Sequence, residues 1–312
     1  MDKTTAQIAA GIRRRVLEHT LKNNGGYLSQ ACSSAETLAV LYKEIMHLGS
    51  TGAPIMPRAF PGVPSPFNPD YFTGGEFNGP HTSEYDRFIF SPAHYALAVY
   101  ACLIETGRMD EKGLEHFNVD GFSVEMIGAE HSPGMEVTNG SLGQALSQAA
   151  GIAYARKLKK EAGKVWVYMS DGEFQIGQTW EAFQFMAHHK LDNMGVFVDV
   201  NCHQCEGRMV DVMNIEPLDA RLNAFGAEAL KVYGHDIKGL LQAASTPHIG
   251  KPLVVLCATN PFEGIPLLKQ NAPKYHYVRI KNEQEKNLYR LELERMSPRT
   301  LNIPGIIRPA GN

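Results

Sequence analysis

Asp171 and Asn201 are the residues of this chain whose types and spacing most clearly permit chemistry. Each follows a short run of apolar residues, at 165–169 and at 196–200. An Asp carboxylate, an Asn amide oxygen and a neighbouring main-chain carbonyl are hard oxygen donors, which suit Mg²⁺ or Ca²⁺ better than zinc. Mg²⁺ usually takes few protein ligands and completes its octahedron with phosphate and water. Together with Gly172, which lets the main chain approach a phosphate closely, these residues indicate a Mg²⁺-bridged diphosphate.

The elements that would position these two side chains form a strand–helix–strand unit. The two apolar runs are bounded by turn residues and predict buried strands. Between them, Trp180, Phe183, Met186 and Ala187 recur at helical spacing within residues 178–190. The right-handed crossover makes the strands parallel, so both polar side chains follow carboxyl ends, where open α/β sheets bind ligands. The same spacing is also compatible with an ordinary unit in which Asp and Asn serve as turn and cap residues.

The stretch 165–207 resembles the thiamine-diphosphate motif of transketolases, which starts with Gly-Asp-Gly and ends near an Asn further along the chain. Residues 188–193 and 212–218 resemble the same family. One departure is Ser170, which stands where the motif has its first Gly. The resemblance implies thiamine diphosphate bound through Mg²⁺, with Ca²⁺ or Mn²⁺ as alternatives. It implies three metal ligands: Asp171, Asn201 and the main-chain carbonyl of His203.

Three further segments carry the resemblance. Ser91-Pro92-Ala93-His94 corresponds to the family's Ser-Lys-Gly-His and keeps its His, while 132–144 and 271–276 resemble two other family motifs. The resemblance implies that His94 and His276 contact both cofactor and substrate and act in catalysis. It also implies cofactor contacts by the following residues: Gly140, Ser141, Leu142, Gly172, Glu173 and Asn201. A structural role, such as a cap or core histidine or a ligand-free turn, is the alternative for His94 and for the Gly140 segment.

Two positions depart from the family where its histidines contact the sugar. They are occupied here by Tyr27, which we expect to bind substrate, and by Ile127. Tyr donates a hydrogen bond, but its ordinary pKa near 10 makes it a poor proton shuttle. Because losing a polar partner relaxes selection for a hydroxyl, we expect an unusual ketose or acceptor and poor handling of ordinary pentose phosphates. The alternative is that His131, which lies nearby in sequence, or a partner subunit restores the missing contacts.

Composition excludes several classes of protein. The 312 residues are 44% hydrophobic and 20% charged, as in globular proteins. A formal net charge of −3 and the lack of a basic run argue against a nucleic-acid partner. No apolar run reaches the roughly 18 residues of a membrane helix, and the N-terminus lacks a signal peptide's apolar core. Five cysteines, an odd number, predict reduced thiols and a cytoplasmic location.

Cys202 and Cys205 form a C-x-x-C sequence. A zinc site would need a second Cys or His pair at suitable spacing. None of the remaining cysteines, Cys32, Cys102 and Cys257, forms one. We therefore expect these two cysteines to lie in a loop without a metal or redox role.

The predicted fold is one α/β domain over residues 1–296, a doubly wound and mostly parallel sheet flanked by helices, followed by a tail at 297–312. The resemblance implies the diphosphate-binding (PP-type) fold of thiamine-diphosphate enzymes. Periodicity predicts a first helix over 5–23 and a second over 35–46, capped by Ser33 or Ser34. Residues 49–85 are rich in Pro, Gly and aromatic residues, which predicts an ordered loop near the cofactor mouth or at a subunit contact.

The matching motifs belong only to the diphosphate-binding half of a transketolase. The resemblance therefore implies the N-terminal subunit of a two-component enzyme that transfers a two-carbon ketol unit from a ketose to an aldose. A C-terminal subunit would supply the pyrimidine-binding domain and the Glu that activates the cofactor, in an α₂β₂ assembly. The alternatives are a subunit of a thiamine-diphosphate-dependent 2-oxo-acid decarboxylating enzyme and a non-catalytic, cofactor-binding regulatory subunit.

Overall fold

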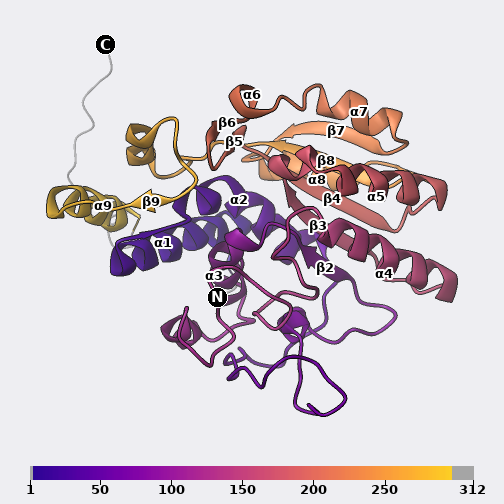
Figure 1. Cartoon of the computed structure of the whole chain (residues 1–312), viewed down its shortest axis with the longest axis horizontal. Coiled ribbons are helices and arrows are strands. Elements are labelled where there is room, and N and C mark those ends of the chain that lie inside the picture. The colour runs from indigo at the N-terminus through magenta and orange to yellow at the C-terminus, as the bar shows by residue number, and fades with distance from the viewer. Residues whose placement is uncertain (1–2, 297–312) are drawn as a thin grey trace.

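A parallel sheet of five strands forms the centre of the computed structural model, which describes residues 3–296 (Figure 1). The tail at 297–312 lies outside the described residues. Strands β3 and β4 are buried along almost their whole length, as expected for parallel strands covered on both faces. The spatial order is β2-β3-β4-β8-β7, with bounds β2 Arg87–Phe90, β3 Val165–Ser170, β4 Met194–Val200, β7 Glu228–Tyr233 and β8 Leu253–Ala258.

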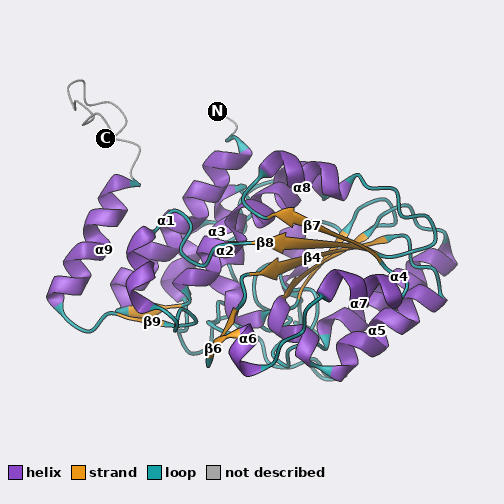
Figure 2. Ribbon diagram, turned by 90° about the horizontal axis from the view of Figure 1, so that it is seen from above, coloured by secondary structure: helices purple, strands orange, loops and turns teal. Residues whose placement is uncertain are grey.

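Helices cover both faces of this sheet, as Figure 2 shows with the sheet seen near its edge. Alternate strand residues enter two separate cores, because successive side chains of a strand point to opposite faces. Trp166 and Tyr168 of β3 join the larger core, whereas Val165, Val167 and Met169 join the smaller one. The larger core packs on α1 (Thr5–Asn23), α2 (Leu28–Val40), α3 (Ala96–Glu105) and α8 (Ile237–Ala244), and the smaller on α4 (Ala145–Lys159), α5 (Gly177–His188) and α7 (Leu218–Ala224). The predicted doubly wound α/β fold is confirmed.

The second helix begins earlier than its sequence predicts. Helix α1 confirms the predicted 5–23, but α2 starts at Leu28 rather than at residue 35. Ser33 and Ser34 are therefore inside the helix and fully buried, and the Ser34 hydroxyl donates to the Gln30 carbonyl. All 13 residues of α2 are buried, so no apolar stripe marks its start, and packing on every side decides where it begins.

Residues 49–85 form an ordered loop that projects at the lower edge of Figure 1. A short 3-10 helix, η2 (Gly74–Asn78), anchors it, with Gly74 N donating to Glu130 O at 2.7 Å and Tyr42 Oη donating to Asn78 Oδ1 at 2.9 Å. A Cβ at Gly74 would lie 1.7 Å from the Ser132 carbonyl oxygen, so only glycine fits there. The loop packs on residues 109–135, and none of its residues lines the cavity that opens at the ends of the central strands.

The C-terminal part of the described chain returns to the start of α2. Strand β9 (Val278–Arg279) pairs antiparallel with β1 (Gly25–Gly26), so residues 275–277 lie beside Tyr27. Ser29 Oγ strengthens this junction by donating to Tyr275 O at 2.7 Å. The remaining elements are η1 (Leu41–Ile45), η3 (Ala93–Tyr95), η4 (Glu111–His116), η5 (Asp171–Gln175), β5 (His203–Gln204), β6 (Gly207–Arg208), α6 (Met209–Val212), η6 (Pro266–Asn271) and α9 (Glu283–Arg295).

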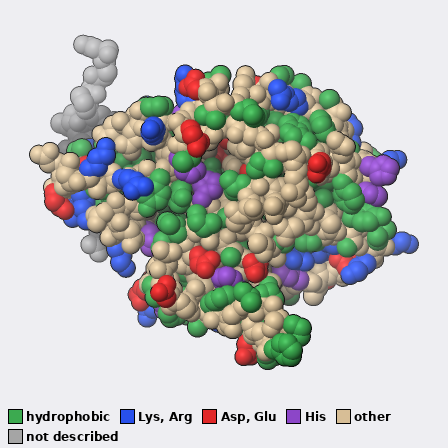
Figure 3. Space-filling view, in the orientation of Figure 1, with side chains coloured by type: hydrophobic (Ala, Val, Ile, Leu, Met, Phe, Trp, Pro, Cys, Tyr) green, Lys and Arg blue, Asp and Glu red, His purple; other side chains and the backbone are tan. Residues whose placement is uncertain are grey.

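Surface charge is mixed on the face shown in Figure 3, where Lys and Arg side chains are interspersed with Asp and Glu. Such a face lacks the single-sign patch with which proteins bind nucleic acid through its phosphates. Within residues 3–296, no helix has the length and hydropathy required to span a membrane.

Candidate cofactor site

A cavity of about 470 Å³ lies at the carboxyl ends of the central strands. The ends of β3 and β4 form its floor, η3 and the start of α2 form one wall, and residues 275–276 form another. Ligands bind to open α/β sheets at this edge. The structure brings nine of the predicted site residues to this cavity: Tyr27, His94, Gly140, Leu142, Asp171, Gly172, Asn201, His203 and His276.

Asp171 and Asn201, thirty residues apart, both reach the cavity floor. Asp171 is 3% exposed and accepts a hydrogen bond from Cys202 N at 2.8 Å. Burial raises the pKa of Asp171 well above its ordinary range, and the neighbouring Asp199 carboxylate raises it further. Among the described residues that line the cavity there is no Lys or Arg. A buried carboxylate without a cationic side chain beside it fits a bound metal cation, which would offset the cost of burying its charge.

The donor set beside Asp171 is made of oxygens. The described part of the chain contains no group of three or more His, Cys, Asp or Glu residues that could hold a metal. The candidate protein ligands are therefore the Asp171 carboxylate and the Asn201 amide oxygen. Asn201 Oδ1 accepts from His203 N at 2.9 Å and, as a carbonyl oxygen with two lone pairs, keeps one free. A carboxylate and an amide oxygen, with phosphate and water completing the shell, match Mg²⁺ rather than zinc.

Gly172 lies next to Asp171 at the start of η5. A Cβ added there would meet no atom within 4 Å. The protein itself therefore does not require glycine at this position, and the open space above it can receive a diphosphate close to the main chain.

Three aromatic side chains from distant segments meet at the side of the cavity. The ring of Tyr27 lies 5.5 Å from that of His94 and 5.4 Å from that of His276, and the two imidazoles are 4.9 Å apart. Burial, with a contribution from His276, lowers the pKa of His94 to about 3, and burial lowers the pKa of His276. Both imidazoles are therefore neutral at physiological pH. A neutral imidazole both donates and accepts hydrogen bonds, which suits a ligand that carries hydroxyl groups.

Glu173 was predicted to contact the cofactor, and the structure assigns it to the scaffold instead. Its side chain is fully buried and does not line the cavity. One carboxylate oxygen accepts from Ser91 Oγ and from Gly143 N at 3.0 Å, and the other accepts from Ser170 N at 2.8 Å and Ser170 Oγ at 3.1 Å. Glu173 thereby ties the ends of β2 and β3 to the turn before α4. Ser170, in place of the motif's glycine, is accommodated by this bond.

Two other residues singled out in the sequence lie outside the lining of the cavity. Ser141 is exposed and does not line the cavity, although its neighbours Gly140 and Leu142 do. His131, the candidate replacement for the histidine missing at Ile127, packs against Phe60. Its ring lies 4.3 Å from that of Phe60, and its Nε2 is 3.4 Å from Glu125, outside the cavity that Ile127 lines.

The C-x-x-C sequence forms one arm of a small hairpin. His203 and Gln204 are extended and pair with Gly207 and Arg208, and both cysteines are free. Along an extended strand the Cα atoms of Cys202 and Cys205 are separated by roughly 10 Å, beyond the about 7 Å that a disulfide spans. The hairpin therefore holds the two thiols apart, and Cys205 contributes to the cavity wall.

Asp199 is a site-forming residue that the motif comparison did not find. It is 1% exposed, two residues before Asn201 on β4, and it accepts hydrogen bonds from four side chains. The available signal was a charged residue inside the apolar run 196–200, since buried carboxylates are rare unless they are satisfied by donors.

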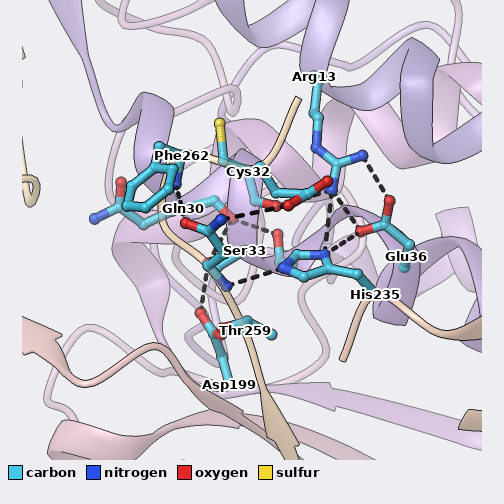
Figure 4. Close-up of polar contacts among 12 residues, drawn as sticks. Arg13, Gln30, Cys32, Ser33, Glu36, Asp199, His235, Thr259 and Phe262 are labelled. Atoms are coloured by element: carbon cyan, nitrogen blue, oxygen red, sulfur yellow. Dashed lines mark hydrogen bonds and ion pairs between the residues drawn. The ribbon is translucent and has the colours of Figure 1, made fainter. Parts of the chain in front are cut away.

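A second buried polar cluster lies next to Asp199, where α1 and α2 pack on the sheet (Figure 4). Arg13 of α1 donates to both oxygens of Glu36 on α2, and His235 Nδ1 lies 2.8 Å from Glu36 Oε2. Asn260 N donates to His235 Nε2 at 2.9 Å. The cluster joins α1 and α2 to the segments that follow β7 and β8, including Thr259, which donates to Asp199.

Comparison with known proteins agrees with this geometry. A family model described as transketolase, thiamine diphosphate binding domain, matches residues 71–298. A transketolase family protein of Sinorhizobium fredii is 34% identical, over 87% of this chain and 90% of its own. One of the subunits of an apulose-4-phosphate transketolase, from Actinobacillus succinogenes, is 33% identical, over 64% of this chain and 73% of its own length.

Among solved structures, a transketolase from Campylobacter jejuni has a TM-score of 0.71 at 21% identity, over 97% of this chain. The present chain spans 49% of that protein's length. The likeness shows that the two share a fold. From the family match and the identity to its relatives, the chain belongs to the transketolase family and contains its thiamine diphosphate binding domain.

Proposed function

We propose that this chain is the N-terminal, diphosphate-binding subunit of a two-component transketolase-like enzyme that transfers a two-carbon ketol unit from a ketose to an aldose. The observation that carries the proposal is the meeting of Asp171 and Asn201 at the floor of a cavity that also collects His94 and His276. A buried carboxylate supplies the cation site, and two neutral imidazoles face the space above it. The family membership agrees with both features.

Asp171, Asn201 and the His203 carbonyl would hold Mg²⁺, or Ca²⁺ or Mn²⁺ in its place, and through it the diphosphate. Gly172 leaves room for the phosphates, and Gly140 and Leu142 would contact the rest of the cofactor. Thiamine diphosphate supplies the carbanion chemistry of ketol transfer when it is bound. His94, His276 and the Tyr27 hydroxyl would orient the sugar through hydrogen bonds. The two neutral imidazoles would also pass protons to and from its hydroxyls.

A partner subunit completes the proposed enzyme. The chain spans about half of a solved transketolase, 49%, and the relative from Actinobacillus succinogenes is itself named as one subunit of a transketolase. We infer that a C-terminal subunit supplies the pyrimidine-binding domain and the Glu that activates the cofactor, and that two copies of each chain form an α₂β₂ assembly.

The substrate is proposed to be a non-standard sugar. Ile127 presents a hydrocarbon where a sugar-facing histidine is expected, and His131 lies outside the cavity lining, against Phe60. This chain also contributes no Lys or Arg to the lining among its described residues, whereas the acidic Glu206 does line the cavity. Any phosphate on the substrate would then have to be bound by the partner. A relative named for apulose 4-phosphate supports this view of a specialised sugar.

Reconstitution tests the proposal. The native chain is purified with its partner, and the pair is assayed on a panel of ketoses and aldoses with thiamine diphosphate and Mg²⁺. We expect ketol transfer by the pair, none by either chain alone, and low efficiency on xylulose 5-phosphate with ribose 5-phosphate. Robust turnover by this chain alone, with the partner excluded by mass spectrometry, contradicts the two-component proposal. Release of CO₂ from 2-oxo acids without ketol transfer would favour the decarboxylating enzyme instead.

A further inference from the structure

The amide of Asn201 has one defined orientation in the site. Its Nδ2 donates to Asp199 Oδ2 at 2.9 Å and to Tyr95 Oη at 3.0 Å. An amide nitrogen has two hydrogens to donate, and both are used here. The amide oxygen is therefore on the opposite side, where it accepts from His203 N at 2.9 Å.

The Asp199 carboxylate lies at the nitrogen end of this amide. Ser33 Oγ at 2.6 Å, Tyr95 Oη at 2.8 Å and Thr259 Oγ1 all approach its carboxylate in addition to Asn201. Figure 4 shows Ser33 and Thr259 beside it. All four neighbours donate to the Asp199 oxygens. Tyr95 donates to Asp199, and its oxygen accepts the second hydrogen of Asn201.

We infer that Asp199 is a positioning residue that fixes which end of the Asn201 amide faces the metal cation. This inference rests on the proposed function, since it requires Asn201 to be a metal ligand. The NH₂ end of an amide has no lone pair to offer a cation, whereas the oxygen end does. A fixed acceptor behind the amide removes the wrong orientation, in the way that groups behind a metal's ligands commonly set ligand geometry.

A double-mutant cycle between positions 199 and 201 separates positioning from general support of the fold. Asn201→Asp places oxygens on both sides of the side chain, so it needs no orientation. In the Asn201 background, Asp199→Leu should weaken Mg²⁺-dependent thiamine diphosphate binding roughly tenfold, the equivalent of about 1.4 kcal/mol. In the Asn201→Asp background, Asp199→Leu should not weaken cofactor binding, because it also removes the repulsion between two adjacent carboxylates.

The readouts are calorimetric titration of the assembled complex with thiamine diphosphate and Mg²⁺, and binding of Mn²⁺ alone followed by electron paramagnetic resonance. Thr259→Val is the matched control, since it removes one donor to Asp199 but leaves the acceptor for Asn201. Thr259→Val should weaken binding by less than roughly threefold, which is less than the loss of one hydrogen bond typically costs. If Asp199→Leu does not fold, Tyr95→Phe replaces it in the cycle, because it removes the second acceptor of the amide and should weaken binding only when residue 201 is Asn.

Equal losses in both backgrounds, or no loss in either, would overturn the inference. The variant Asn201→Ala distinguishes failure of the positioning role from failure of the proposed metal site. If Asn201→Ala retains native Mg²⁺-dependent affinity, Asn201 is not a ligand and the site proposal itself falls. If Asn201→Ala weakens binding while Asp199→Leu does not, the site stands and only the positioning role is wrong.

Discussion

Replacing Asp171 with Asn should change stability and cofactor binding in opposite directions. Asp171 is buried, and among the described residues it accepts a hydrogen bond from Cys202 N but faces no Lys or Arg across the cavity. Asn has nearly the same shape, and its Oδ1 can keep the bond to Cys202. The substitution therefore removes the charge while leaving the local geometry in place.

The sign of the stability effect follows from the pKa of Asp171, which burial and Asp199 raise above its ordinary value. For an acid of this kind, the metal-free folded state loses stability as pH rises from the ordinary pKa to the folded pKa, and the loss is complete above it. At pH 7.5 the metal-free Asn variant should therefore be more stable. Desolvation of one partly hydrogen-bonded carboxylate suggests about 1–3 kcal/mol, or a rise in Tm of roughly 2–6 °C.

The affinity for the cofactor should decrease, in contrast to the stability. Loss of a charged ligand from a buried cation site typically costs at least about 3 kcal/mol, which corresponds to a roughly 100-fold weaker Kd. Thermal and urea unfolding of the chain in EDTA would measure stability, and calorimetry of the assembled complex with Mg²⁺ would measure affinity. Asp120→Asn, at an exposed position, is the control and should alter stability by less than about 0.5 kcal/mol. Near-native affinity of a folded Asn variant would refute the metal assignment, and a lower Tm would refute the electrostatic reasoning.

Three further variants test other parts of the site. The pKa of His94 is about 3 in the folded chain, so this histidine takes up a proton at higher pH in the unfolded chain than in the folded one. Lowering the pH from 8 to 5.5 should therefore reduce the free energy of unfolding by about 1.4 kcal/mol through this residue. His94→Phe should remove that loss in urea titrations at the two pH values, and an unchanged pH slope would contradict neutral burial. Glu173→Gln should lower the free energy of unfolding, measured in urea, by about 2–3 kcal/mol, because either amide orientation sets an NH₂ against the N–H of Gly143 or of Ser170. A loss of less than about 0.5 kcal/mol, as for a substitution on the exposed surface, would argue against this scaffold role. Ile127→His should raise kcat/KM of the complex for xylulose 5-phosphate and ribose 5-phosphate about tenfold, as one added hydrogen bond to a substrate hydroxyl can, and no rise would show that this position does not select the sugar.

The central strand–helix–strand unit could be predicted closely, and the second helix could not. Apolar runs and helical spacing indicated β3, α5 and β4 to within a few residues, because each element has its own period and clear turn residues at its ends. Helix α2 is buried on every side. A helix without a polar face leaves no periodic pattern to read, so its start was misplaced by seven residues, from 28 to 35.

The polar residues at strand ends were also accessible from sequence. Asp171 and Asn201 follow consecutive parallel strands, and the geometry of such strands alone places their carboxyl ends at one edge of the sheet. Glu173 illustrates the limit of motif comparison. It lies within the motif, yet its oxygens are taken by donors from β2, from β3 and from the turn before α4, which no local pattern announces.

By itself, therefore, the sequence determined the α/β alternation, the parallel central pair of strands and the oxygen donors at their ends, since these depend on interactions between residues close along the chain. Only the tertiary structure decided that Tyr27, His94 and His276 form one cluster, because the pairing of β1 with β9 and the packing of α2 join segments far apart in sequence. It also brought the Asp199 carboxylate into contact with the Asn201 amide. Burial and hydrogen-bond direction belong to the assembled fold, and a residue's type and position in the chain do not specify them.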